Sequence, residues 1–77
     1  MSMTQLSSMR AGQSGSVAGL EGGLGLKRKL ENMGVRPGVR ITKVNSQIMR
    51  GPVIIRVGGT RLAIGHRMAR RIMVDVD

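Results

Sequence analysis

The sequence predicts a mainly β fold, in which about five short strands form a small barrel and one α-helix follows the first strand. Two patterns carry this prediction. From Val39 onward apolar and polar residues alternate with the period of a strand, whereas Leu26, Leu30 and Met33 recur at the spacing of one helical face. A small sheet has unpaired edges unless it closes, and glycine-rich strands bend readily, so closure into a barrel is the simplest architecture.

The N-terminal part is expected to supply one bent strand. The chain has 77 residues, enough for one domain spanning 1–77 and too few for a large enzyme core. Residues 1–9 show no sustained period and are expected to form a turn or lid, with Leu6 and Met9 spaced to plug the core. Residues 13–20 then predict the first strand, with Gly15 and Gly19 at bulges or close backbone approaches.

The helix is predicted over residues 24–33, and residues that stop helices flank both of its ends. Two glycines precede it, Gly34 stands where a left-handed residue would end it, and Pro37 prevents its resumption. Pro37 and Gly38 suit the central positions of a type II turn.

The remaining chain predicts short strands separated by turns. A bulge or strand end is expected near Lys43, because Val44 interrupts the alternation. The elements predicted after it are a loop over 45–51, a strand over 52–57, a tight hairpin at Gly58-Gly59, a strand over 60–64, a single helical turn over 66–71 and a last strand over 72–76.

Composition excludes several classes of function. The chain has no Phe, Tyr, Trp or Cys, which removes base-stacking platforms, disulfides and thiolate metal sites. Thirteen basic residues against four acidic ones give a net charge of +9, which favours a polyanion, an anionic membrane surface or an acidic protein as partner. The longest apolar run, residues 53–55, is far too short to span a membrane, and no secretory signal is visible, so we expect a cytoplasmic protein.

Four segments together resemble the FeoA family of ferrous iron transport accessory proteins. They are GGLGL at 22–26, LENMGVRPG at 30–38, PVIIRVGGTRLAI at 52–64 and ARRIMV at 69–74. The resemblance covers about residues 6–76, and the order and spacing of the segments make it specific. Many relatives have Pro where Ala11 stands here, which loosens one turn.

The resemblance implies an SH3-like barrel, a cytoplasmic location and a role beside FeoB, the membrane iron transporter with a cytoplasmic G-domain. It carries over no catalytic residue. The partner surface is therefore predicted from the helix itself, on the face opposite the apolar stripe: Leu24, Lys27, Arg28 and Glu31.

His66 is the one candidate metal ligand among nitrogen donors. A single imidazole makes no site, so no resident cofactor is expected, only a weak association with iron or zinc, within one chain or between chains. The lone histidine and four acids provide no acid–base pair, so we expect no enzyme. The alternative function is a small basic nucleic-acid-binding barrel; the absence of aromatic residues argues against it, and the oligomeric state stays open.

Overall fold

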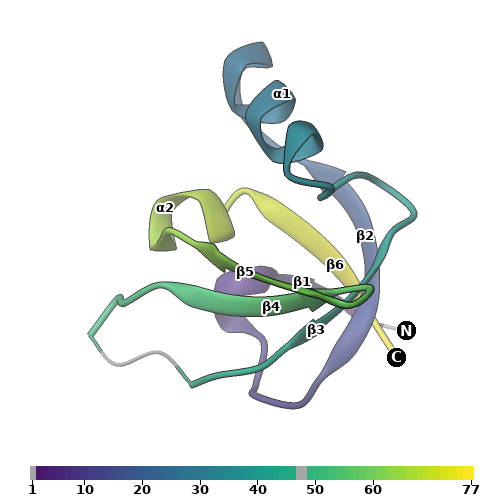
Figure 1. Cartoon of the computed structure of the whole chain (residues 1–77), viewed down its shortest axis with the longest axis vertical. Helices are drawn as coiled ribbons and strands as arrows, with labels where there is room; N and C mark the ends of the chain where they lie inside the picture. The colour runs from purple at the N-terminus through teal and green to yellow at the C-terminus, as the bar shows by residue number, and fades with distance from the viewer. Residues whose placement is uncertain (1, 47–48) are drawn as a thin grey trace.

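The computed structural model describes residues 2–46 and 49–77, in which six strands form one sheet (Figure 1). In chain order the elements are β1 (Ser2–Gln5), the 3-10 turn η1 (Leu6–Ser8), β2 (Ser14–Leu20), α1 (Leu24–Asn32), β3 (Arg40–Lys43), β4 (Val53–Val57), β5 (Thr60–Ile64), α2 (His66–Ala69) and β6 (Ile72–Val76). The predicted mainly β fold, with one longer helix after the strand that begins near residue 13, is confirmed.

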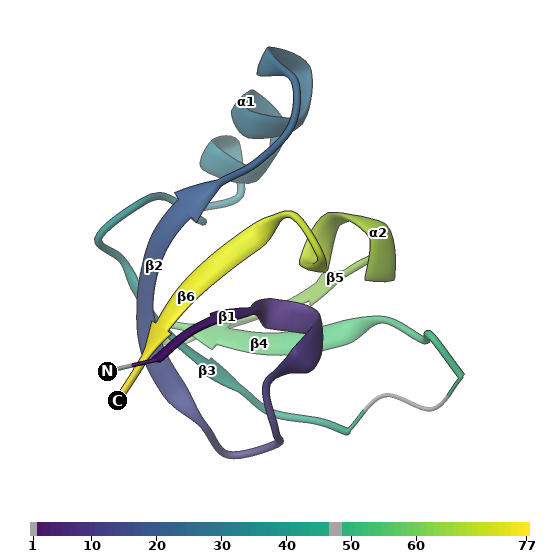
Figure 2. The ribbon, with the colours of Figure 1, turned by 180° about the vertical axis from the view of Figure 1, so that it is seen from behind.

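The sheet curls around the core as a partly open barrel. Its strand order is β1-β6-β2-β3-β4-β5, and neighbouring strands run antiparallel. Strands β1 and β5 stand at the two ends of this order, and over residues 2–46 and 49–77 no ladder joins them, so the complete closure expected from the sequence is not reached there. Figure 2 shows the curl from behind, with the short coil of η1 directly after β1.

The N-terminal segment differs from the expected turn or lid. Ser2–Gln5 forms an edge strand along β6, which raises the strand number from about five to six. Its side chains are exposed or half-buried, so it lacks the buried positions that produce a period-2 pattern. The turn that follows plugs the core as predicted, since Leu6 is 0% exposed and Met9 is 3% exposed.

Glycine is required where β2 crosses β6. A Cβ on Gly15 would lie 2.4 Å from the carbonyl oxygen of Asp75 and 2.9 Å from the Cα of Val76, so the predicted close approach is confirmed. The register of the same strand pair shifts between Val17 and Gly19, which is the bulge expected near Gly19.

The predicted turns after the helix are also confirmed. Gly34 has a φ of +94° just beyond the Met33 cap, and α1 ends at Asn32, one residue earlier than predicted. Gly38 has a φ of +93°, and the Val39 amide donates to the Arg36 carbonyl oxygen at 3.1 Å, which closes the turn.

The later strands follow the predicted alternation. Strand β3 ends at Lys43, as expected, and the Gly58-Gly59 hairpin joins β4 to β5. The turn over 66–71 contains α2, which is four residues long. The predicted loop over 45–51 includes residues 47 and 48, which lie outside the described residues.

The core is aliphatic apart from one methionine. Its buried members come from every element of the fold except β1: Leu6, Met9, Val17, Leu30, Val35, Ile41, Val53, Ile55, Ile64, Ala69, Ile72, Val74 and Val76. Four half-buried residues are among those that pack against this cluster: Leu26, Met33, Val39 and Val57. Within the part of the chain that the structure describes, no helix has the length and apolar character needed to cross a membrane.

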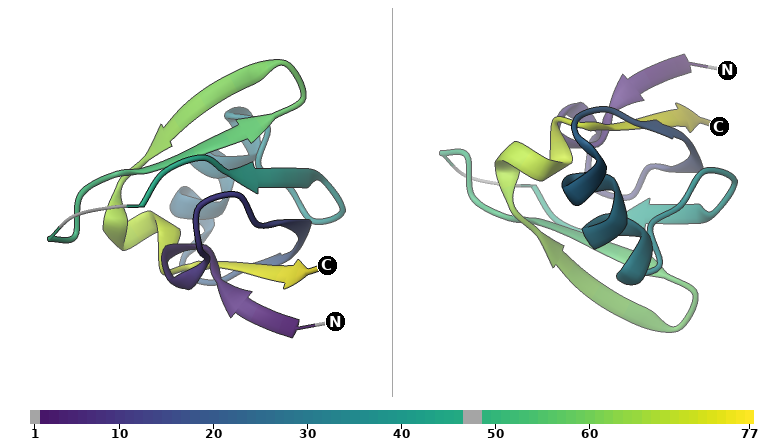
Figure 3. Two further views of the ribbon diagram at one scale, coloured as in Figure 1. Left: turned by 90° about the horizontal axis from the view of Figure 1, so that it is seen from below. Right: turned by 90° about the horizontal axis from the view of Figure 1, so that it is seen from above.

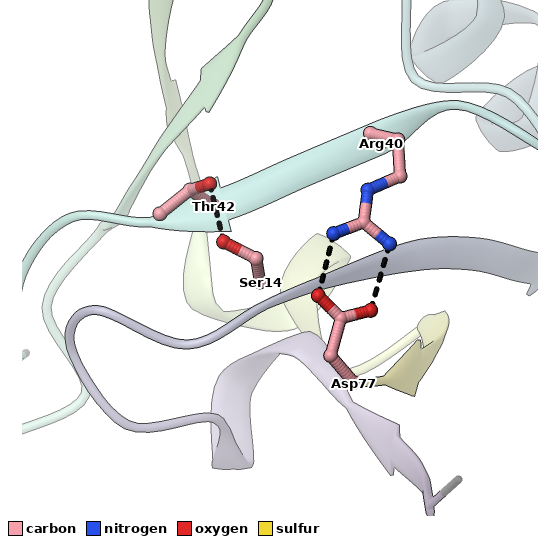
Figure 4. A network of polar contacts seen from close by, with 4 residues as sticks. All are labelled: Ser14, Arg40, Thr42 and Asp77. Carbon is pink, nitrogen blue, oxygen red and sulfur yellow. Dashed lines mark hydrogen bonds and ion pairs between the residues drawn. The ribbon is translucent and has the colours of Figure 1, made fainter.

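Two polar pairs join distant segments at the barrel surface (Figure 4). The Ser14 and Thr42 hydroxyls lie 2.7 Å apart across β2 and β3. The two terminal guanidinium nitrogens of Arg40 donate to the Asp77 carboxylate, at 2.7 and 2.5 Å, and this pairing lowers the pKa of Asp77. Because the pair is exposed, it orients the chain end more than it stabilises the fold.

Lys43 is a charged residue inside the barrel, only 2% exposed. Its ammonium donates to the carbonyl oxygen of Met9 and, at 3.4 Å, to that of Ser7. The Lys43 backbone also exchanges hydrogen bonds with the turn after η1, donating to Gln13 at 2.9 Å and accepting from Gly12 at 2.7 Å. Lys43 therefore fixes the turn that contains Leu6 and Met9, here named the plug, from inside the barrel. Burial of its ammonium removes water from the charge and lowers the pKa of Lys43.

We expect Lys43→Ala to lower the free energy of unfolding by about 2–4 kcal/mol, because it leaves a cavity and removes the donor to Met9. Lys43→Met keeps the volume and should cost about 1–2 kcal/mol. Urea unfolding followed by circular dichroism measures both. Equal losses in the two variants would contradict a packing role for the long side chain.

The same lysine predicts a pH dependence. Its pKa in the folded chain lies below 10.5, so below that pH the unfolded state binds more protons than the folded state. The free energy of unfolding should therefore rise as the pH increases toward 10.5, and Lys43→Met should lack this contribution. Unfolding curves of both proteins at several alkaline pH values test it; parallel pH profiles would refute it.

Candidate functional site

The outward face of α1 is the surface that the sequence singled out. Leu24, Lys27, Arg28 and Glu31 follow the i, i+3, i+4, i+7 spacing, which places them on one face of the helix. Leu24 is 63% exposed, Arg28 and Glu31 are exposed, and Lys27 is half-buried. We name these four residues the α1 outer face.

The opposite face of the helix fixes α1 to the barrel. Leu30 and Val35 are both 0% exposed, and Leu26 and Met33 pack against the core. Gly22 has a φ of +116°, and a Cβ there would lie 2.9 Å from the Leu26 side chain, so glycine allows the chain to turn tightly into the helix. Figure 3 shows α1 lying over one end of the barrel, outside the sheet.

A second group of polar residues gathers around α2, which the sequence did not single out. A hollow of about 410 Å³ is lined by residues from β1, from the segment before α1 and from the α2 region: Gln5, Glu21, Arg67, Arg70 and Arg71. A neighbouring hollow of about 500 Å³ shares Arg67 and Arg70 and adds Arg50, Gly65, His66 and Met68.

His66, the candidate metal ligand, lies at the start of α2 in the second hollow. Its Nδ1 is buried without a hydrogen-bond partner among the described residues. Those residues also contain no group of three or more His, Asp or Glu side chains that could hold a metal ion. Arg50, Arg67 and Arg70 line the same hollow, and their charge disfavours a cation there. The weak iron or zinc association of His66 stays a prediction.

Comparison with known proteins decides the family. Residues 4–76 match the family model described as FeoA domain. The chain belongs to the FeoA family. A protein of Methanocaldococcus jannaschii with the provisional name Fe(2+) transport protein A is 33% identical to this FeoA chain over 73 residues, which are 95% of this chain and 87% of the relative.

Solved structures extend the likeness. A crystal structure described as iron uptake regulatory protein (FeoA) is 40% identical, with a TM-score of 0.90 and complete coverage of both chains. A manganese-dependent transcriptional repressor has a TM-score of 0.86 at 20% identity, covering 94% of this chain and 40% of the repressor, which shows the fold alone. The SH3-like fold expected from the FeoA resemblance is confirmed.

The sequence located the helix face but missed the group around α2. The missed signal is a group of three arginines. Arg67 and Arg70 are one helical turn apart, and Arg71 directly follows Arg70. In the sequence these arginines count only toward the net charge of +9, and nothing sets them apart from the other basic residues. It had no means of bringing Gln5 and Glu21 to the same place, because that depends on β1 and on how the chain enters α1.

The two faces of α1 predict opposite effects on folding. Leu30→Asp should leave the chain unfolded at 25 °C, because it puts an unpaired charge at a position that is 0% exposed. Arg28→Glu should change the free energy of unfolding by no more than about 0.5 kcal/mol, because Arg28 is exposed. Thermal melts followed by circular dichroism compare the two, and a cooperative melt of Leu30→Asp near the parent temperature would contradict this packing.

Proposed function

We propose that this chain is a cytoplasmic, single-domain accessory protein of ferrous iron uptake that docks on a FeoB-type membrane transporter and regulates it without being an enzyme. Membership of the FeoA family supports the iron transport role. The observation that carries the docking surface is the α1 outer face, where an exposed leucine stands among charged residues on a helix whose other face is anchored.

The α1 outer face has the chemistry of a helix that enters a groove. Leu24 offers an apolar anchor at one end, while Arg28 and Glu31 offer charges of opposite sign. Helices of this kind bind through residues spaced i, i+3, i+4 and i+7, and their charges fix the register against the partner. The face is already helical before binding, so docking requires little ordering of this chain.

A non-enzymatic role agrees with the chemistry of the described side chains. The four acidic residues lie in three separate places: Glu21 follows β2, Glu31 lies in α1, and Asp75 and Asp77 lie in and just beyond β6. Asp77 is paired with Arg40, and His66 is surrounded by arginines in its hollow. These placements provide neither a paired acid and base nor a nucleophile beside a base.

The basic surface supports a location beside an anionic inner leaflet. Each exposed Lys or Arg near such a surface contributes about 1 kcal/mol, so a few of the thirteen would concentrate the chain where a transporter sits. This attraction adds to docking and does not replace the α1 outer face.

The test is binding of the purified chain to a solubilised FeoB-type transporter, measured by biolayer interferometry at about 150 mM salt. Arg28→Glu and Leu24→Ser should each weaken binding by about tenfold or more, because one reverses an interface charge and the other removes the apolar anchor. Both positions are exposed, so folding should be unaffected.

Arg61→Glu on β5 is the matched control, because Arg61 is also exposed and the substitution changes the net charge by the same amount. It should bind within about twofold of the parent. Equal weakening by Arg28→Glu and Arg61→Glu would show that net charge alone drives the association. Parent-like binding of Arg28→Glu and Leu24→Ser would remove the α1 outer face from the proposal.

A further inference from the structure

We propose that the hollow lined by Gln5, Glu21, Arg67, Arg70 and Arg71, here named the arginine hollow, binds a phosphate-bearing ligand with at least two negative charges. This goes beyond the docking function, because it concerns a different surface and requires no transporter.

The arginine hollow is assembled from three segments that are far apart in the chain. Gln5 ends β1, Glu21 follows β2, and the three arginines lie in α2 and in the link to β6. The walls are joined by a hydrogen bond from the Glu21 amide to the Arg71 carbonyl oxygen, at 2.7 Å. Its volume of about 410 Å³ is large enough for a phosphate or diphosphate group.

The backbone that carries the arginines is held on both sides. The Arg70 amide donates to His66 at 3.1 Å and the Arg71 amide donates to Met68 at 2.9 Å. Between and beside the arginines, Ala69 and Ile72 are 0% exposed and anchor the segment in the core. The arginine side chains therefore project from a fixed frame, and this lowers the entropy lost on binding.

The guanidinium groups lack partners of their own. Throughout residues 2–46 and 49–77, the side chains of Arg67, Arg70 and Arg71 make neither an ion pair nor a hydrogen bond, in contrast to Arg40, which holds Asp77 in two hydrogen bonds. Glu21 is the one carboxylate lining the hollow, so its three guanidinium groups and one carboxylate leave a formal charge of +2. The positive charges of the three guanidinium groups repel one another, and an anion that enters the hollow offsets this repulsion.

The residue types favour phosphate over other anions. Arginine presents a planar fork of donors that matches two phosphate oxygens, and the hollow contains arginine and no lysine. The Gln5 Oε1 accepts from the Ser7 hydroxyl at 3.5 Å, and the amide NH₂ of Gln5 is a further donor among the lining groups. Glu21 provides an acceptor for a hydroxyl of the ligand. Its negative charge also repels a ligand that is purely anionic at that edge of the hollow.

The adjoining hollow adds to the positive field. It shares Arg67 and Arg70 and contributes Arg50 and His66, so a phosphate chain that extends from the arginine hollow past these two arginines meets further donors. The ligand chemistry has two sources, a soluble di- or polyphosphate and the headgroup of an anionic phospholipid, and the test has an arm for each.

The first arm titrates the ¹⁵N-labelled full chain with sodium pyrophosphate at constant ionic strength, near 150 mM. We expect saturable amide shifts confined to Gln5, Glu21 and residues 65–72, and binding at least tenfold weaker in Arg67→Gln/Arg70→Gln. The matched control, Arg36→Gln/Arg61→Gln, removes the same charge from exposed arginines outside the hollow and should bind within about twofold. Arg71→Gln repeats the test with one substitution if the double variant melts early.

The second arm pellets the same proteins with phosphatidylglycerol vesicles and with phosphatidylcholine vesicles. Phosphatidylglycerol binding that requires Arg67 and Arg70 and is displaced by pyrophosphate assigns the hollow to a lipid headgroup. Pyrophosphate binding without such vesicle binding assigns it to a soluble phosphate.

The proposal is overturned if neither ligand binds, if pyrophosphate shifts spread over all basic residues, or if both double variants weaken binding equally. These outcomes leave the α1 outer face untouched, because its test uses Arg28, Leu24 and the transporter.

Discussion

The hydrogen bonds from the buried ammonium of Lys43 to the turn after β1 are the interaction on which the rest of the structure depends. A chain without aromatic side chains has few bulky groups to fill a barrel, and here Leu6 and Met9 supply the missing volume from outside the sheet. Their turn contacts α2 and β6, and Lys43 binds its carbonyl groups from within the barrel. Burying the charge is costly, and it is tolerated because the ammonium satisfies backbone groups that the plug would otherwise leave without donors.

This arrangement decides which surfaces are left for partners. The plug packs against α2 and β6, whereas α1 covers one end of the barrel, where Leu30 of the helix and Val35 just beyond it are buried. The other face of α1 is free to meet a second protein. The plug directly follows β1, which pairs with β6 and brings Gln5 beside the arginines of α2 and of the link to β6. The α1 outer face and the arginine hollow thus lie on the same small barrel.

The sequence predicted the parts that depend on local patterns. Alternation located β3 to β6, and Gly34 and Gly38 marked the helix end and the turn because those positions require a positive φ. It missed β1, because an edge strand with exposed side chains carries no apolar signal. The sequence also did not indicate that Lys43 is buried. Lysine is usually a surface residue, and only the position of the plug makes Lys43 a buried donor. The four residues of the α1 outer face followed from helical spacing, whereas the arginine hollow depends on contacts between segments distant in sequence.

Native-state hydrogen exchange of the plug tests this account most directly. The amide of Met9 donates to Leu6 and that of Gly12 donates to Lys43, whereas the amide of Val17 in β2 donates to Val39, which directly precedes β3. If the plug is part of the core, the opening free energies of Met9 and Gly12 should lie within about 1 kcal/mol of that of Val17. Rapid exchange of Met9 and Gly12 while Val17 stays protected would show a frayed segment resting on an independently stable barrel, and would contradict the account.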